Sequence, residues 1–497
     1  MKRQLLYILL PLTVLVAKAA NVDSALVEHR SLWRMVDCQA RKNPALNSSA
    51  FGSSYSELAL GVDIRHQSEA FVLEKGKGFT LPWVGVNTWL RLSDRTAVWG
   101  TASYLTGTQR DITWNSTTDF DLLQPYVLAD TLGGNTRRER YAFSGGYATR
   151  VGQWLLGAEM LFRAEQEYRD QDPRMRGVVT DLTLRFGAGR SLGNYLLGAA
   201  VEGNIYRQTN SVDFYSEEGV IPEYQLTGLG TEYSRFSGDK RSIYHDGGGA
   251  AFRLSAQPIG SLGFYADVTL DEHRYHRKLA DYNSMPLTDL YCEHVGANVG
   301  WRKQTDSRLA LFLMADYTKR TGDEHVGGTS NARYFPVIAC LTMYKNHLFH
   351  TAVGALYGRQ KWNASARIGW RNQTEEYVYP HRQLDYGQVY GELNGQLFLT
   401  LSSALRLKLD ARTAYTAHAS DKVVMPYANM DAKSVLLIRH KCDYAQANYT
   451  ELSGKVRVDY SWPDSRYGLF VQLAGGGVFC SLGEQQLDLH ASVGITF

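Results

Sequence analysis

The sequence lacks the long apolar runs that helical membrane proteins require. After Val16 no run of about 18 apolar residues occurs, and the mean hydropathy of the chain is −0.30. A helix needs about 20 mostly apolar residues to cross a bilayer. The sequence therefore excludes a bundle of membrane-spanning helices.

Cysteine and proline are scarce, and motifs that hold cofactors are missing. The 5 cysteines are widely spaced and odd in number, which predicts neither a disulfide framework nor a metal site. The glycine runs at residues 247–249 and 475–477 lack the Lys-Ser/Thr pair of a phosphate-binding loop. With only 12 prolines, long strands can run without interruption. We expect no cofactor.

The first residues have the three parts of a secretory signal peptide. Lys2 and Arg3 supply positive charge, residues 5–16 are mostly apolar, and residues 17–19 form a small-x-small cleavage site. Residues 1–19 are therefore predicted to be removed, together with Lys2, Arg3 and Lys18. Of the 53 Lys and Arg residues, 50 remain against 50 Asp and Glu. No basic excess points to a nucleic-acid partner.

The other end of the chain is a strand with one apolar and one polar face. From Leu487 to Phe497, apolar residues occupy the odd positions, and polar residues or glycine occupy the even ones. Alternate side chains of a strand point to opposite faces. A closing strand that ends on an aromatic residue resembles the assembly signal of bacterial outer-membrane barrels. Phe497 is therefore the predicted signal for the barrel-assembly machinery.

The same alternation recurs with charged residues on the polar face. Residues 405–412 and 455–462 alternate apolar and mostly charged side chains. Such charges are costly in a dry core, but they suit a water-filled lumen whose wall turns its apolar face to lipid. The predicted lumen-facing residues are Arg163, Arg406, Lys408, Asp410, Lys455, Arg457 and Asp459.

Short turns and longer loops alternate along the chain, as in outer-membrane barrels. The pattern predicts a closed antiparallel transmembrane β-barrel of about 18 strands, with 16 to 20 as the range, over residues 55–497. Short turns are predicted at residues 93–95, 151–153, 190–193, 258–261, 303–308, 358–361, 402–404 and 462–466. The predicted outer loops are residues 67–78, 115–138, 170–175, 210–242, 277–288, 318–334, 378–387, 417–445 and 480–484.

One predicted strand is unusually long. Residues 344–347 look like a turn, but the alternation keeps the same frame on both sides of them. We therefore expect residues 335–357 to form one strand. Because about 10 residues span a bilayer, this strand should project beyond the membrane.

Residues 20–54 precede the first predicted strand. Residues 24–42 fit an irregular amphipathic helix, which Asn43-Pro44-Ala45 ends. This Asn-Pro-Ala turn resembles one in fatty-acid-transporter-type barrels, whose N-terminal segment lies in the lumen as a hatch. A periplasmic helix or a plain lead-in is the alternative. The segment is too short for the plug domain of a TonB-dependent receptor.

Two of the long predicted loops are rich in aromatic and acidic residues. Loops such as 115–138 and 210–242 are seldom simple tethers. They can fold over the mouth of the barrel, line an entry site or dock a partner; alternatively they pack on each other for stability. The predicted contact residues are Asp119, Asp121, Tyr126, Asp130, Phe214, Tyr215 and Tyr224.

The sequence contains no obvious catalytic constellation. A barrel-embedded hydrolase needs a Ser or an acid beside a His. Residues 271–276 are rich in ligand types, but His273 and His276 lie on opposite faces of a strand and cannot share one ion. We expect no enzyme and no metal site; a barrel hydrolase is the remaining enzymatic alternative.

Three segments of the chain resemble a known protein family. They are residues 114–134, 162–174 and 216–238. They include Trp114-Asn115 and Phe162-Arg163-Ala164. The chain resembles an uncharacterised family of Gram-negative outer-membrane barrels of similar length. The resemblance covers nearly the whole mature chain and implies a location and a fold, but no substrate. Because such barrels tend to accompany surface lipoproteins and receptors, it also implies a possible surface complex.

Two functions fit these expectations. The first is a channel or transport component for small solutes or nutrients, because a barrel of this size encloses an aqueous interior. The second is a non-conducting binding or scaffold barrel in a cell-surface complex with a lipoprotein or receptor. A secreted, glycosylated eukaryotic protein is a further alternative, but the Phe-terminated strand and the charged inner faces count against it. The expected location is the bacterial outer membrane, among its lipids.

Overall fold

The computed structural model of the 497-residue chain describes most of the sequence. The described residues are 25–215, 223–233, 242–280, 284–329, 336–359, 361–426, 428–429, 431–462, 465 and 467–497. The predicted signal peptide, residues 1–19, lies outside the described residues.

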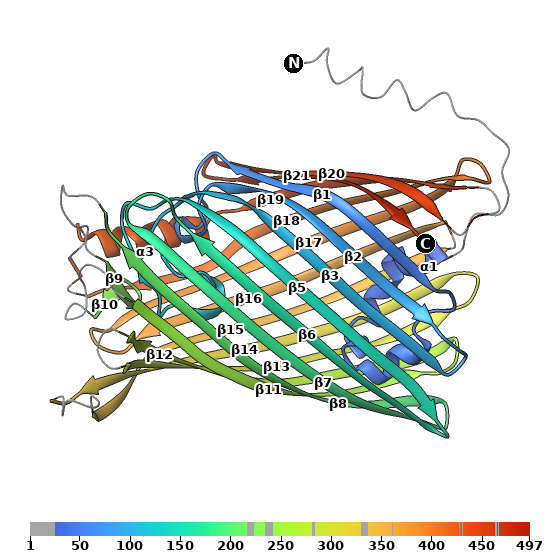
Figure 1. Ribbon diagram of the computed structural model, residues 1–497, viewed down its shortest axis with the longest axis horizontal. Helices are drawn as coiled ribbons and strands as arrows, with labels where there is room; N and C mark the ends of the chain where they lie inside the picture. Colours follow the sequence, from blue (N-terminus) through green and yellow to red (C-terminus); the bar gives the residue numbers. More distant parts are fainter. Residues whose placement is uncertain are drawn as a thin grey trace, which may run out of the picture.

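Antiparallel strands form one closed 18-stranded barrel (Figure 1). The first strand pairs with the last, so that the sheet has no free edge. This confirms the predicted fold. The barrel strands are β1 (Tyr55–Gln67), β2 (Gly78–Arg91), β3 (Thr96–Ile112), β5 (Gly134–Val151), β6 (Trp154–Tyr168), β7 (Arg174–Leu192), β8 (Tyr195–Asp213), β11 (Ser242–Pro258), β12 (Leu262–Leu279), β13 (Met285–Gln304), β14 (Arg308–Gly327), β15 (Val337–Arg359), β16 (Trp362–Tyr377), β17 (Arg382–Thr400), β18 (Leu405–Val424), β19 (Tyr449–Ser461), β20 (Gly468–Cys480) and β21 (Gln485–Thr496).

Smaller elements lie before the barrel and in its loops. Among the described residues, no helix is long and apolar enough to cross a membrane. The strands β4, β9 and β10 form a separate small sheet. These elements are α1 (Ala25–Arg30), α2 (Phe120–Leu123), α3 (Lys433–Ala445), β4 (Leu128–Ala129), β9 (Tyr224–Gly228), β10 (Thr231–Glu232) and 3-10 turns at Leu32–Met35, Ala40–Lys42, Pro44–Ser49 and Leu73–Lys75.

The closing strand β21 has the predicted faces and the predicted partner. Its register against β1 runs from Glu57 opposite Thr496 to Gln67 opposite Gln486. Leu489 is 49% exposed on the outer wall, whereas Gln486 is buried inside. Backbone hydrogen bonds of 3.0 and 3.1 Å join Phe497 to Ser56 in both directions. The last residue thus extends the seam that seals the barrel.

Short turns and long loops lie at opposite ends of the barrel. Each predicted short turn joins the two strands expected, and these turns share one end with α1 and the C-terminus (Figure 1). We call this the turn end, and the opposite end, where α3 and β9 lie, the loop end. The alternation follows because antiparallel neighbours return the chain after each crossing.

Several predicted outer loops were too long. The strand β14 runs to Gly327 and β18 runs to Val424. The first residues of the predicted loops 318–334 and 417–445 therefore belong to these strands. The loop predicted at 115–138 ends at residue 133, because β5 starts at Gly134. Paired strands satisfy their backbone groups in water as well as in lipid, so polar residues do not end them. The long strand predicted at 335–357 is confirmed as β15, with 23 residues.

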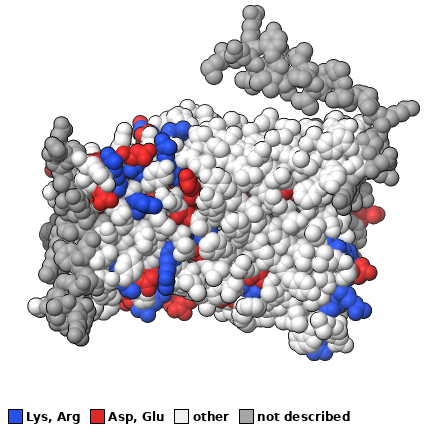
Figure 2. Space-filling model, viewed as in Figure 1, with Lys and Arg blue, Asp and Glu red and all other residues white. Residues whose placement is uncertain are grey.

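The outer wall has an uncharged belt between two charged ends. Figure 2 shows Lys, Arg, Asp and Glu gathered toward the loop end and at the turn end, with few between them on this face. Apolar side chains such as Phe186 and Ile205 are more than half exposed on the belt. An apolar band flanked by polar rims is what a bilayer requires of a barrel.

Candidate functional site: a lumen closed at both ends

Residues 25–54, here called the hatch, lie inside the lumen at the turn end (Figure 1). The hatch is an irregular chain of short helical turns rather than the single amphipathic helix expected. Trp33 and Val36 pack on wall residues Tyr265, Ala310 and Leu356 in one small buried cluster. A second cluster joins Ala40, Ala45 and Leu46 to Leu155 of β6. The hatch is therefore held by small apolar contacts on part of the wall.

The Asn-Pro-Ala turn is the most closely fitted part of the hatch. Asn43 Nδ2 donates to the carbonyl oxygens of Ala188 and Ala199 (3.1 Å each), and Asn43 Oδ1 accepts from the Ala45 N–H (3.0 Å). A Cβ on Gly157 would lie 2.5 Å from the Ala45 nitrogen. Wall positions without side chains therefore let the turn approach the backbone of β6 to β8.

The loop end is closed by a larger structure, here called the mouth plug. It consists of residues 113–133, β9 and α3. The two loops singled out from the sequence meet here, because β4 pairs with β9. The helix α3 was expected to be loop, although its buried residues Val435, Ile438 and Cys442 have helical spacing. The buried cluster that joins these three parts to the wall contains Trp114, Leu123, Tyr126, Val127, Ala129, Val179, Tyr206, Leu226, Leu229, Tyr275, Leu290, Tyr344, Tyr377, Leu384, Leu437, Ile438 and Cys442.

Wall arginines fasten the backbone of the mouth plug. Arg277, which is 1% exposed, donates to the carbonyl oxygens of Leu226 (3.1 Å) and Val127 (3.2 Å). Arg320 donates to the carbonyl oxygens of Gln124 (3.1 Å) and Asp121 (2.9 Å). Loop carbonyls buried in this way need donors, and two arginines from the barrel supply them.

Arg163, predicted to face the lumen, and Asp119, predicted to be a loop contact, form one ion pair. Arg163, expected to face the lumen, does so and binds Asp119 of the mouth plug through both carboxylate oxygens (2.8 and 2.6 Å). Glu165 and Asp181 lie within 3.3 Å of the same guanidinium. Its charge therefore holds the plug and is not free for a solute.

The predicted contact residues of the first loop are mostly buried. Tyr126 is 1% exposed and Asp130 is fully buried, so neither can dock an outside partner. Asp130 accepts from Arg169 Nη1 (2.9 Å) and Ser116 Oγ (2.8 Å). Asp121 alone among the acids of this loop is largely exposed, beside Lys75 (2.7 Å). The aromatic and acidic content of the loop thus reflects folding into the lumen.

The predicted residues of the second loop differ in exposure. Phe214 packs on a buried cluster around Leu128. The Tyr224 ring lies 5.5 Å from that of Trp114. Tyr215 is 68% exposed, and Arg174 lies 4.2 Å from the centre of its ring. Only Tyr215 therefore offers a surface to a partner.

Beside the hatch lies a cavity of about 1240 Å³, here called the chamber. The hatch lines one side, and the inner faces of β17 to β21, β1 and β2 line the other. The chamber exists because inward positions of β19 and β20 carry short side chains, including Ser453, Ala474 and Gly476. The hatch fills the opposite side of the lumen, where Gly157 and its neighbours receive it.

Most predicted lumen-facing residues of β18 and β19 reach the chamber or its edge. Lys408 donates to Asp410 (2.9 Å), and Lys455 also lines the chamber. Arg406 shares their inward face nearer the turn end. Alternation in a strand places these side chains inside, as expected.

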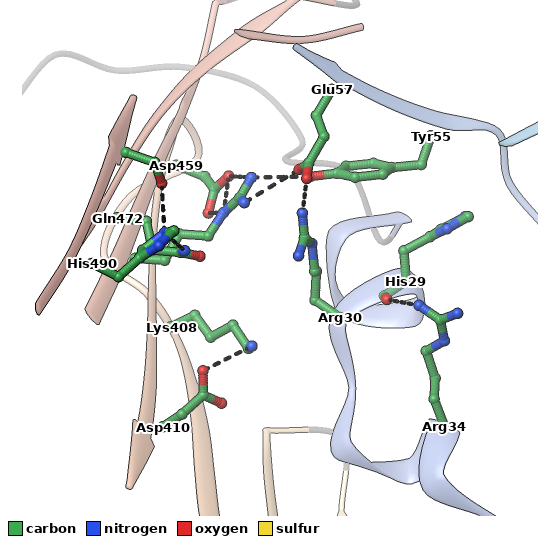
Figure 3. A network of polar contacts seen from close by, with 12 residues as sticks. His29, Arg30, Arg34, Tyr55, Glu57, Lys408, Asp410, Asp459, Gln472 and His490 are labelled. Carbon is green, nitrogen blue, oxygen red and sulfur yellow. Dashed lines mark hydrogen bonds and ion pairs between the residues drawn. The ribbon is translucent and has the colours of Figure 1, made fainter. Parts of the chain in front are cut away.

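Arg457 and Asp459 belong to a buried network at the edge of the chamber (Figure 3). Arg457, 1% exposed, donates to Asp459 (2.8 Å) and to Tyr55 Oη (3.0 Å). Glu57 accepts from Arg457 (3.3 Å) and from Arg30 of the hatch. The hatch is therefore joined to the barrel seam by charge as well as by packing.

Burial lowers the pKa values of three hatch residues, His29, Arg34 and Arg41. Burial lowers the pKa of His29, which stacks on Phe51 with ring centres 3.8 Å apart. Burial inside the lumen, followed by repulsion from Arg41 and Arg30, lowers the pKa of Arg34 to about 10. Arg34 still carries its charge near neutral pH and presents it to the chamber.

The described part of the chain holds no group of three or more His, Cys, Asp or Glu residues that could bind a metal ion. His273 shares the inner face of β12 with Tyr275, and its ring stacks on the Tyr275 ring. His276 faces outward and pairs with Asp289 (2.6 Å). The two histidines thus lie on opposite faces of the wall.

One known protein family matches most of the chain. A family of unknown function (DUF6850) matches residues 44–497, from the Asn-Pro-Ala turn to the last residue. The chain belongs to this family. The resemblance found in the sequence to an uncharacterised barrel family is thereby confirmed, and no curated protein matches the chain.

The solved structures to which the chain is similar include two transporters and one receptor. The ferric citrate transporter FecA, in its unliganded form, is 12% identical with a TM-score of 0.42, over 90% of this chain and 79% of that one. The copper transporter OprC is 10% identical with a TM-score of 0.41, over 90% and 81%. The siderophore receptor PirA of Acinetobacter baumannii is 9% identical with a TM-score of 0.40, over 89% and 80%. Identities this low carry no information about a ligand.

Proposed function

We propose that the protein is a gated transport barrel of the bacterial outer membrane that carries small solutes or nutrients. The observation that supports this most is the chamber of about 1240 Å³ kept open in the lumen beside the hatch. A barrel that served only as a scaffold would have no need of a cavity lined by charged side chains such as Arg34, Lys408 and Lys455. Because the hatch and the mouth plug occupy the two ends of the lumen, we infer that the barrel described here is a resting state rather than an open porin.

The proposal assigns the loop end to the cell surface and the turn end to the periplasm. This orientation follows the usual placement of long loops and short turns in such barrels. Lipid would surround the uncharged belt, and the barrel-assembly machinery would read β21 and Phe497. Deleting Phe497 removes two backbone hydrogen bonds to Ser56. We expect slower assembly, seen as a smaller heat-modifiable band in outer-membrane fractions; unchanged assembly would contradict this role.

We propose the hatch as the moving gate. Its contacts include three small apolar clusters, the Asn43 hydrogen bonds, the hydrogen bonds of Gln396 to the backbone of residues 30 and 32, and the Arg30 and Asp37 ion pairs. The mouth plug, in contrast, shares one large buried cluster with the wall. Because gating elements come from the less stable parts of a fold, the hatch is the better candidate.

Single-channel conductance in planar bilayers tests this gate. In Gly157→Ala the new Cβ would lie 2.5 Å from the Ala45 nitrogen and 2.7 Å from Ala45 Cα, so the hatch must shift. Overpacking of this kind costs about 1–3 kcal/mol, which moves the docked equilibrium roughly tenfold or more. We expect frequent openings in this variant and few in the wild type.

Gly203→Ala is the matched control, because its Cβ would meet nothing within 4 Å. It should behave as the wild type. A variant that deletes residues 25–54 provides a second route to an open gate. If both Gly157→Ala and the deletion stay silent, the hatch is not the gate.

A scaffold in a surface complex is the second candidate, and one observation favours it. Near the loop end the outer faces of β12 to β14 carry a collar of charged residues above the apolar belt, including Arg274, Asp289, Glu293 and Lys319. A surface lipoprotein or receptor could dock on this collar and on Tyr215. A silent barrel that co-purifies with such a partner would support the scaffold. We propose no catalytic role.

A further inference from the structure

We propose that the chamber is a binding site for small multivalent anions, with Arg34 of the hatch and Lys455 of the wall as the cations that hold them. This inference rests on the proposed transport function, because it names the class of solute. The shared chemistry is a compact phosphate or carboxylate anion with two or more negative charges.

Cations from the hatch and from the wall converge on this cavity. Arg30, Arg34 and Arg41 reach it from the hatch, and Lys408 and Lys455 reach it from β18 and β19. They lie close enough to influence one another: Lys455 is within electrostatic range of Lys408 and Arg30, and Arg34 is within range of Arg41 and Arg30. Cations gathered in this way repel one another unless anions lie between them.

The carboxylates that line the chamber are already engaged. Asp410 accepts from Lys408 (2.9 Å). Asp488 pairs with Arg65 (2.7 Å), and Asp63 pairs with His490 (2.6 Å). Glu451 pairs with Arg412 (2.8 Å). The three pairs with Lys or Arg cancel in charge, and the Asp63 pair is a hydrogen bond to an imidazole, so the remaining cations outnumber the one carboxylate without a Lys or Arg partner.

Arg34 and Lys455 are cations of the chamber that have no carboxylate partner among the described residues. Arg34 donates to the His29 carbonyl oxygen (2.7 Å), its guanidinium lies 4.8 Å from the centre of the Phe51 ring, and it has no ion pair with any described carboxylate (Figure 3). For Lys455, no described residue lies within hydrogen-bond or ion-pair distance of its ammonium group. Arg41 adds a buried Nη1 that has no hydrogen-bond partner in the described chain. Donors left over beside a cavity are complementary to an anion.

The size and the wall of the chamber suit a small ligand. Its volume of about 1240 Å³ exceeds that of a phosphate or a short dicarboxylate with its water, and ligand sites commonly measure about 300–1,000 Å³. The neighbouring Ser453 supplies a hydroxyl group, and Gly476 leaves the backbone open to the cavity. Both Arg34 and Lys455 line this cavity, so a small anion that enters it meets a cation from the hatch and a cation from the wall.

The test is anion binding by the full mature chain, purified in detergent. Chloride is replaced at constant ionic strength by inorganic phosphate in one series and by succinate in another, and the melting temperature is followed. The wild type should be stabilised by both anions. R34Q and K455Q should each weaken apparent affinity by about tenfold, since each removes one charge-assisted hydrogen bond. K361Q, which removes an exposed cation at the turn end, is the control and should bind as the wild type.

Heat-modifiable gel mobility shows whether each variant is a closed barrel. If K455Q fails to close, R34Q still decides, because Arg34 lies outside the wall. Equal affinity of R34Q and the wild type, no stabilisation by either anion, or an equal loss in K361Q would overturn the site. If Gly157→Ala conducts while R34Q and K455Q bind the anions like the wild type, the proposed transport function is supported and the proposed anion site is contradicted. If the anions bind as expected but neither hatch variant conducts, the site stands and the proposed gate falls.

Discussion

The two closures of this barrel are built differently. At the turn end the hatch touches the wall through three small clusters and scattered hydrogen bonds and ion pairs, and the chamber lies beside it. At the loop end the mouth plug draws on three loops and shares one apolar cluster with seven wall residues. Fully buried arginines and tyrosines fasten the plug, whereas the hatch ion pair between Asp37 and Arg302 is partly exposed. The plug is part of the folded core, and the hatch is an attachment to it.

We expect the largest loss of stability when a buried ion pair of the mouth plug is removed. Arg169 and Asp130 are 1% and 0% exposed at their side chains. In Arg169→Met the Asp130 carboxylate stays buried without its cation, which should reduce the free energy of unfolding by about 3–5 kcal/mol. Urea unfolding of the detergent-solubilised barrel measures the change.

An exposed ion pair and the hatch pair provide the controls. Arg174→Met removes the exposed partner of Asp172 and should change the same free energy by about 1 kcal/mol or less. Arg302→Met, which frees Asp37 of the hatch, should fall between the two. If Arg302→Met destabilised the barrel as much as Arg169→Met, the two closures would be equivalent.

Glycines that contact the mouth plug or the hatch allow a second comparison, with a smaller expected change in the free energy of unfolding. In Gly322→Ala the new Cβ would lie 2.5 Å from Cε2 of Tyr126, which is buried and cannot move aside. We expect a loss of about 1–3 kcal/mol in unfolding free energy. Gly157→Ala should cost less, because the hatch can undock as a unit while the barrel stays closed. A larger loss for Gly157→Ala would show that the hatch belongs to the core.

Native cysteines report on the two closures without perturbing stability. Cys38 of the hatch is exposed, while Cys442 of α3 is buried, and burial raises the pKa of Cys442 from 9.0 to about 11. Burial also raises the pKa of Cys38, so the contrast between the two thiols rests first on their exposure. Maleimide labelling mapped by mass spectrometry should therefore modify Cys38 before Cys442, and labelling of Cys442 should keep rising up to about pH 11. Equal rates at pH 8 would contradict the packing of α3.

The barrel was predictable because alternation is a local signal. Strands such as β21 show which face meets lipid in a dozen residues, and the turns between strands carry their own composition. Loop lengths were less predictable, since outward charges on β14 and β18 suggested loop where the strands continue beyond the belt. The helix α3 had a helical pattern that was not recognised in the sequence.

The site was predictable only in part, for a physical reason. Inward charges such as Lys408 and Lys455 follow from parity, and the structure places both at the chamber. Which charges are free depends on partners distant in sequence: Arg163 is bound by Asp119, 44 residues away, whereas Lys455 has no such partner among the described residues. The close fit at Gly157 depends on Ala45, which lies 112 residues earlier in the chain (157 − 45). Such pairings arise from tertiary contacts.

Native-state hydrogen exchange of the closed barrel tests the central claim most directly, because it compares the two closures in one molecule. Backbone amides of residues 25–54 should exchange at least roughly tenfold faster than those of residues 113–133, since the hatch can open without unfolding the barrel. Exchange in the hatch that is as slow as in the mouth plug, or slower, would contradict the account of a movable gate facing a fixed plug.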